Sequence, residues 1–140
     1  PAGLEVGATP DGRGAKEPLS DAASPMYGRD KKGPLSVALS LSKPDYRKAA
    51  LGTVLNQKFS PAMFASEEKL DRMVALVRTY FAQGGQEMQI NSVSREILAD
   101  AMENPDRYRS LVVRVSGFSA YYVSLDPAVQ LDILSRTEQG

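Results

Sequence analysis

The chain has 140 residues, of which 42% are hydrophobic, and this is enough for a single domain with a modest core. Basic and acidic residues number 17 each, so charge gives no reason to expect a nucleic-acid or membrane partner. Cysteine and histidine are absent, which excludes disulfides, thiolate nucleophiles, cysteine or imidazole metal sites and a Ser-His-Asp triad. No apolar run reaches the length of a membrane span.

Residues 1–34 contain five prolines and six glycines, a spacing that excludes a long helix or a central strand. Few large apolar residues occur among them, so the segment cannot form a core of its own. We expect either a disordered tail or a segment that lies over other protein. The chain starts at Pro1 without a methionine or a signal-peptide pattern, which favours a fragment or a processed chain.

The next two elements are predicted as strands. Leu35, Val37, Leu39 and Leu41 alternate with serine and alanine, a period of two that predicts a strand over residues 35–41, ended by Pro44. Residues 52–59 predict a second, weaker strand.

Two helices follow, each with a serine as N-cap. Ser66 precedes an acidic first turn, and apolar residues at helical spacing continue to Gly84 and Gly85, where the first helix ends. Residues 88–91 predict a short strand. Ser94 begins the second helix, which ends at residues 104–105, an Asn-Pro pair.

The last part of the chain predicts a strand, a loop and a helix. Residues 111–115 form a β-branched run typical of a buried strand, and residues 118–123 include three aromatic residues. Asp126 and Pro127 are typical of a helix start, with proline at the first helical position. The order of elements indicates an α/β fold.

Gly117 directly follows the predicted buried strand. On its own it indicates a tight turn that needs a positive φ. Its neighbours form the run Arg114, Val115, Ser116, Gly117, Phe118, Ser119 and Ala120. This run resembles the signature loop of the glycyl radical enzymes, the family that includes pyruvate formate-lyase, choline trimethylamine-lyase, glycerol dehydratase and benzylsuccinate synthase.

The resemblance extends in order over nearly the whole chain. The matching segments are residues 7–13, 24–33, 84–91, 100–108 and 136–138. It implies the C-terminal portion of a ten-stranded barrel, with the radical loop after a buried strand. Residues 1–34 would then be the end of the lyase barrel domain, and residues 35–140 the glycyl radical domain region.

The resemblance implies that Gly117 carries a radical. Glycine suits this role because a backbone radical needs a nearly planar Cα, where a side chain would clash with the flanking peptide groups. In the family, an activating enzyme uses S-adenosylmethionine and an iron–sulfur cluster to remove a hydrogen from the glycine. The radical then produces a thiyl radical on a cysteine, which attacks the substrate. Since this chain has no cysteine, we expect that cysteine outside it and expect the chain alone to be inactive.

The implied partners are the rest of the barrel with its cysteine, the activating enzyme and a second copy of the full enzyme in a homodimer. No bound cofactor, metal, nucleic acid or membrane is implied. The expected setting is oxygen-sensitive anaerobic metabolism in the cytoplasm or inside a bacterial microcompartment. The type of bond that is cleaved stays open and could be carbon–carbon, carbon–nitrogen, carbon–oxygen or carbon–sulfur. The loop differs from that of the pyruvate formate-lyase group, which favours a lyase or dehydratase outside that group.

Several neighbouring residues receive secondary roles. Arg114 is expected to position the loop or to contact the activating enzyme, with a structural salt bridge as the alternative. Phe118, Tyr121 and Tyr122 are expected to pack around the radical and exclude oxygen and water. Gln86 and Glu87 replace a histidine-containing version found in several members.

Two other functions stay open. A free-standing radical carrier that restores a damaged enzyme fits the size and the lack of cysteine. Such carriers resemble the region from Gly84 onwards but not residues 7–13, so this hypothesis ranks second, and the length of the reading frame distinguishes the two. A structural or binding module, in which Gly117 is only a turn, requires all five matching segments to be accidental.

Overall fold

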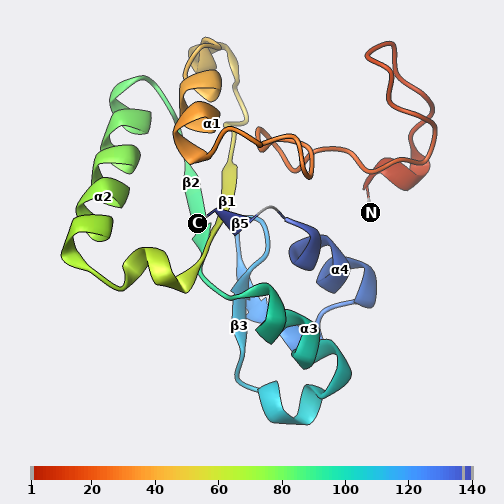
Figure 1. Cartoon of the computed structure of the whole chain (residues 1–140). Coiled ribbons are helices and arrows are strands. Elements are labelled where there is room, and N and C mark those ends of the chain that lie inside the picture. Colours follow the sequence, from red (N-terminus) through yellow and green to blue (C-terminus); the bar gives the residue numbers. More distant parts are fainter. Residues whose placement is uncertain (1, 137, 140) are drawn as a thin grey trace.

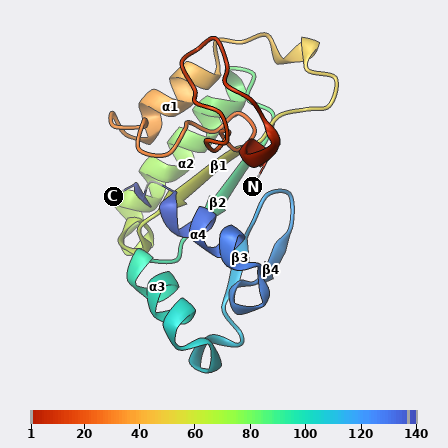
Figure 2. The same cartoon turned by 90° about the vertical axis from the view of Figure 1, so that its right-hand side faces the viewer.

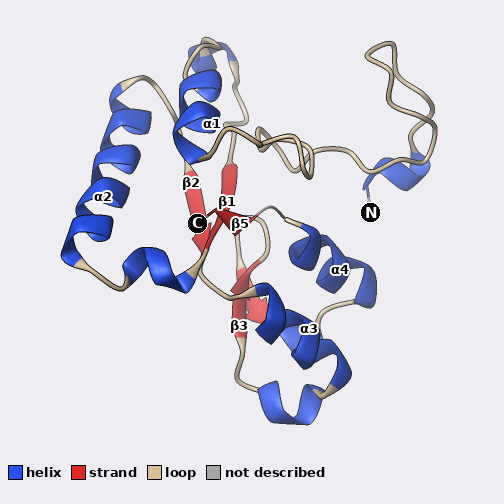
Figure 3. Cartoon of the chain, viewed as in Figure 1, coloured by secondary structure: helices blue, strands red, loops and turns tan. Residues whose placement is uncertain are grey.

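The computed structural model describes residues 2–136 and 138–139, which form a mixed α/β structure, as expected (Figures 1 and 3). Helices and strands alternate along most of the chain. The α-helices of this part are α1 Pro34–Leu41, α2 Glu67–Ala82, α3 Arg95–Glu103 and α4 Pro127–Ser135. Its strands are β1 Leu55–Phe59, β2 Met88–Asn91, β3 Val112–Arg114, β4 Ser119–Tyr121 and β5 Glu138–Gln139.

The strands form two small sheets. β1 lies between β2 and β5 in a parallel sheet, and every residue of β1 is buried. β3 and β4 form an antiparallel hairpin. The parallel sheet lies between α1 and α2 at one end of the molecule and α3 at the other (Figures 1 and 2). The hairpin carries the loop that contains Gly117, so the position of this loop depends on what β3 packs against.

Each end of the molecule has its own apolar cluster. The first joins α1 and α2 to the start of β1 through Val37, Ala38, Leu55 and Tyr80. The second joins the hairpin to α3 and α4, and its buried members are Leu98, Ala101, Val113, Val115, Tyr122 and Ile133. The hairpin is therefore anchored by the second cluster, from which Val113 and Val115 extend to the start of the loop.

The strand predicted over residues 35–41 is wrong, because this segment is helix α1. Pro34 occupies the first turn, where its fixed φ suits a helix and its missing N–H has no intrahelical partner to lose. Val37, Ala38 and Leu41 share one helical face and contact the first cluster. The large apolar residues of this helix also lie two positions apart in the sequence, as they would in a strand. The alternation alone therefore did not distinguish a helix from a strand.

The other predicted elements are confirmed, with shifted ends. Ser66 and Ser94 cap α2 and α3 by accepting hydrogen bonds from the main-chain N–H of the third residue along. Asp126 caps α4 by accepting a hydrogen bond from the main-chain N–H of Ala128, two residues along. The weaker strand is shortened to Leu55–Phe59. The strand expected to be fully buried is only partly so, since Val112 is 50% exposed whereas Val113 is 2% exposed.

Before α1 begins at Pro34, the described part of residues 1–34 contains one short 3-10 helix, η1 Ala2–Glu5, and otherwise turns and loops (Figure 3). In Figure 1 its first half extends away from the sheets. Its second half lies against the rest of the chain, where Ala23 N donates to Val54 O at 3.0 Å. The expectation that this segment lies over other protein is therefore met for the residues that follow Leu19. The division of the chain at residue 34 stays a prediction.

Gly85→Ala is expected to lower the unfolding free energy by about 3 kcal/mol, at the upper end of the usual range for overpacking. A Cβ at this position would lie 2.4 Å from two carbons of the Tyr80 ring, and Tyr80 is only 1% exposed, so the ring cannot move aside. Urea unfolding measures the change. Gly7→Ala is the matched control, since a Cβ there meets nothing within 4 Å, and equal losses in both variants would contradict the overpacking explanation.

Candidate functional site

Gly117 lies in a two-residue turn at the tip of the β3–β4 hairpin. The last strand pair is Arg114 opposite Ser119, and Val115 N donates to Phe118 O at 2.9 Å, which leaves Ser116 and Gly117 to form the turn. The φ angle of Gly117 is 79°, and an added Cβ would meet nothing within 4 Å. Within this chain, the backbone conformation rather than the available space therefore requires glycine.

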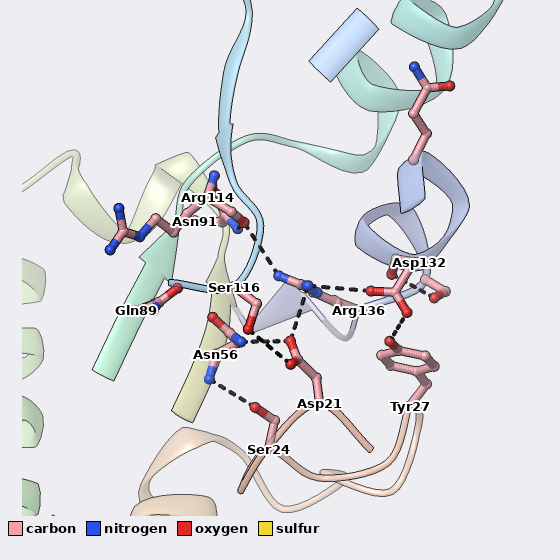
Figure 4. Close-up of polar contacts among 12 residues, drawn as sticks. Asp21, Ser24, Tyr27, Asn56, Gln89, Asn91, Arg114, Ser116, Asp132 and Arg136 are labelled. Carbon is pink, nitrogen blue, oxygen red and sulfur yellow. Dashed lines mark hydrogen bonds and ion pairs between the residues drawn. The ribbon is translucent and has the colours of Figure 1, made fainter. Parts of the chain in front are cut away.

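Two side chains of β2 hold this loop from one side (Figure 4). Gln89 and Asn91 are two residues apart in a strand, so they point to the same face. Arg114 N donates to Asn91 Oδ1 at 2.7 Å, and Asn91 Nδ2 donates to Arg114 O at 2.6 Å. Gly117 N donates to Gln89 Oε1 at 3.0 Å. The Asn91 side chain thus pairs with β3 as a strand would, and Gln89 holds the glycine itself.

Asp21 holds the loop from the other side, and its carboxylate contacts three parts of the chain that are far from it in the sequence (Figure 4). Its carboxylate accepts hydrogen bonds from Ser116 Oγ at 3.2 Å, Asn56 Nδ2 at 2.6 Å and an Arg136 guanidinium nitrogen at 3.1 Å. Next to it, Asn56 N donates to Ser24 Oγ at 2.9 Å. The segment around Asp21 is therefore attached to β1, the loop and the end of α4.

Arg136 is the cation of this cluster and is only 9% exposed. Besides Asp21, its guanidinium contacts the Asp132 carboxylate at 3.3 Å and the main-chain oxygen of Arg114 at 3.4 Å. The Tyr27 hydroxyl donates to Asp132. Burial, together with this hydrogen bond, raises the pKa of Tyr27 well above its usual value, so the hydroxyl keeps its proton at neutral pH.

The predicted loop residues differ in their surroundings. Val115 is buried and Ala120 packs against the second cluster, whereas Ser116, Gly117 and Ser119 are exposed in this chain. Arg114 donates to Ser119 Oγ at 3.3 Å across the hairpin. Within the described residues Arg114 forms no ion pair, so the expected salt bridge is not found, and the positioning role stays a prediction.

The three aromatic residues expected to enclose the loop do not act together. Tyr122 is fully buried, and its hydroxyl donates to Gln130 O at 3.0 Å. Phe118 and Tyr121 are each 54% exposed, and neither is among the residues packed against the second cluster. These two residues do not enclose the loop within this chain, and their packing around the radical in the full enzyme stays a prediction.

From the sequence alone, no role was assigned to the residues that position the loop, although most of them lie in the segments that carry the resemblance. Gln89 and Asn91 share one face of a predicted strand, and two amide side chains on a short, half-buried strand were a signal of a polar contact. Asp21 and Asn56 gave no comparable signal. Arg136 was part of the matching segment 136–138, whose middle residue, Thr137, lies outside the described residues.

No group of side chains that could hold a metal ion occurs in residues 2–136 and 138–139. Among the same residues no helix is long and apolar enough to cross a membrane.

Gly117 is thus exposed at the tip of a hairpin, and hydrogen bonds hold its loop on both sides. The family model described as "Glycine radical" matches residues 19–123, well over half of the chain. The chain belongs to this glycyl radical family.

Its relatives are much longer enzymes, of which it spans about one sixth. It is 45% identical over 139 residues to a probable dehydratase of Escherichia coli and 41% identical over 134 residues to the trans-4-hydroxy-L-proline dehydratase of Clostridioides difficile. These matches cover 99% and 96% of this chain and 17% of each relative. The glycerol-bound B12-independent glycerol dehydratase of Clostridium butyricum superposes with a TM-score of 0.92 at 44% identity, over 98% of this chain and 17% of that one. The chain matches the C-terminal part of such structures.

Proposed function

We propose that Gly117 carries a glycyl radical and that this radical generates a thiyl radical on a cysteine outside this chain. The thiyl radical then starts cleavage of a bond in a small substrate. Three relatives are named as dehydratases, reactions that break a carbon–oxygen bond, so we propose carbon–oxygen cleavage ahead of the carbon–sulfur, carbon–nitrogen and carbon–carbon alternatives.

The position of Gly117 carries the proposal. The turn exposes the glycine and leaves the space around its Cα open within this chain, so a hydrogen on Cα is accessible to an activating enzyme. The hydrogen bonds that the loop donates to Gln89, Asn91 and Asp21 give it one defined arrangement. This loop is held by side-chain contacts at its tip rather than by a long ladder of main-chain hydrogen bonds. It is therefore also able to leave its position during activation and to return afterwards.

The chain cannot complete the reaction alone, because it contains no cysteine. We propose that the rest of a glycyl radical enzyme barrel supplies the thiol and covers the exposed loop, and that an S-adenosylmethionine-dependent iron–sulfur enzyme installs the radical. The full enzyme is proposed to be a homodimer that works in the cytoplasm or in a bacterial microcompartment. The free-standing carrier ranks second, since the match to complete enzymes includes residues before Gly84.

The test is anaerobic activation of the chain together with a barrel that carries the cysteine. We expect an organic-radical doublet in the electron paramagnetic resonance spectrum. On exposure to air we expect backbone scission at Gly117, located by mass spectrometry of the two fragments. A relative that activates under the same conditions serves as the positive control, and a chain that gives neither doublet nor scission beside it would contradict the proposal.

The proposed barrel also predicts that the separate chain binds an apolar dye. Val112, Phe118 and Tyr121 are each at least 50% exposed on the hairpin, and the edge of a hairpin with apolar residues favours association. We expect fluorescence of anilinonaphthalene sulfonate to rise with the chain alone and to fall when the barrel is added. A dye-silent monomer would contradict an interface on this hairpin.

A further inference from the structure

The main-chain N–H of Gly117 is the last member of a short series of hydrogen bonds. Gly117 N donates to Gln89 Oε1 at 3.0 Å, and Gln89 Nε2 donates to Glu87 Oε1 at 2.7 Å. The two partners fix the orientation of the Gln89 amide, because an N–H must meet its oxygen and a carboxylate must meet its nitrogen. In this series the glycine amide therefore donates to the side-chain amide, and the side-chain amide donates to the carboxylate.

The series is held rigidly by its surroundings. Gln89 is 5% exposed, and its main chain pairs with Asn56 in the parallel sheet. The main-chain oxygen of Glu87 accepts from Leu55 N at 3.0 Å, while its side chain is on the surface. The buried amide is therefore fixed, and only the carboxylate at the outer end is accessible to solvent.

The physical effect of this arrangement falls on the nitrogen of Gly117. A carboxylate that accepts from one end of an amide makes the oxygen at the other end a stronger acceptor, since hydrogen bonds in series polarise one another. A stronger acceptor draws the proton of the Gly117 N–H and leaves more electron density on that nitrogen. In a glycyl radical, the nitrogen is the group that donates electron density to the electron-poor Cα.

We propose that Glu87 and Gln89 tune the glycyl radical by increasing electron donation from the Gly117 nitrogen. This inference rests on the proposed function, because it needs a radical on Gly117. Gln89 acts as a positioning residue that contacts the glycine amide, and Glu87 acts through Gln89. The pair moves spin density from Cα to nitrogen and slows the decay of the radical.

The experiment uses the complete enzyme that contains this chain, activated under anaerobic conditions. Gln89→Met keeps the length of the side chain but removes the amide acceptor. We expect the splitting by the remaining α-hydrogen to increase, the nitrogen coupling to decrease, and the anaerobic decay of the doublet to become about fivefold faster, as for the loss of one neutral hydrogen bond. Glu87→Gln should change the spectrum in the same direction by a smaller amount, because the amide still accepts but carries no charge.

Two further variants complete the test. The double variant Glu87→Gln with Gln89→Glu places the carboxylate directly on the Gly117 N–H, and we expect the α-hydrogen splitting to fall below that of the unchanged enzyme. Glu103→Gln changes a surface carboxylate with no contact to the loop and should leave the spectrum unchanged.

The two proposals fail in different ways. Absence of a doublet in the unchanged enzyme would contradict the proposed function. A doublet whose splitting and decay are the same in Gln89→Met and in the unchanged enzyme would overturn the tuning role. The splitting is read only from molecules that hold the radical, so a lower yield does not affect it. If Gln89→Met does not fold or activate, the surface variant Glu87→Gln decides, and an unchanged spectrum there overturns the tuning role.

Discussion

Gly117→Ala is expected to abolish the radical doublet and the air-induced scission completely. An alanine radical needs its methyl group in the plane of the two flanking peptide groups, where it clashes with them, and the methyl group also shields the α-hydrogen. The folded chain, in contrast, has space for the methyl group, since nothing lies within 4 Å of the added Cβ. The variant should therefore fold, and electron paramagnetic resonance after anaerobic activation measures the loss.

The matched control is Gly33→Ala. Gly33 has a φ of 82°, close to the 79° of Gly117, and its added Cβ also meets nothing within 4 Å. Both variants place a side chain at a positive φ, and the ψ of 171° puts Gly33 in a region that only glycine readily adopts, so Gly33→Ala should cost at least as much stability as Gly117→Ala. We expect a loss of stability in both variants and loss of the radical in Gly117→Ala alone. A doublet that survives Gly117→Ala would contradict the assignment of the radical to this residue.

The hairpin shows how far local sequence determines this site. The β-branched run and the glycine after it predicted a strand followed by a turn, and β3 and the turn at Ser116 and Gly117 lie there. The helix caps Ser66, Ser94 and Asp126 were equally readable, because a cap depends on residues within one turn. These features depend on short-range hydrogen bonds and on steric preferences of single residues.

The supports of the loop could not be predicted in the same way. Asp21 and Ser116 are 95 positions apart, and Arg136 lies 115 positions from Asp21, so their contacts exist only because the chain folds back on itself. An aspartate in a loop rich in small residues has many possible roles, and nothing local selects one. The error at residues 35–41 has a related cause, since the face of α1 is decided by its packing on α2.

The two exposed aromatic residues show a further limit of prediction from this sequence. Phe118 and Tyr121 were expected to enclose the glycine, yet each is 54% exposed in this chain. Neither of them is among the residues that form or pack against the apolar cluster that anchors the hairpin. In the proposed enzyme, the surface that covers them belongs to the barrel, so their role depends on residues that this sequence does not contain.

Arg136→Ala is expected to lower the unfolding free energy by about 3 kcal/mol, the lower end of the range for breaking a buried ion pair. The guanidinium lies between the carboxylates of Asp21 and Asp132, whose side chains are about one fifth exposed. Its removal leaves two carboxylates near each other without a cation, and it removes a contact to the main-chain oxygen of Arg114 at the start of the loop. Urea unfolding of the chain measures the stability.

The control for Arg136→Ala is Arg72→Ala. Arg72 forms an ion pair with Glu68 at 2.5 Å, but both side chains are more than 70% exposed, and such pairs contribute at most about 1 kcal/mol. Arg136→Lys should recover only part of the loss, because one ammonium group cannot reproduce the planar contacts that reach both carboxylates and the carbonyl. Equal losses in the Arg136 and Arg72 alanine variants would mean that the cluster around Asp21 stabilises the chain no more than a surface ion pair does. A larger loss in Arg136→Ala would instead show that the buried cluster around Asp21 stabilises the chain through residues that are far apart in the sequence.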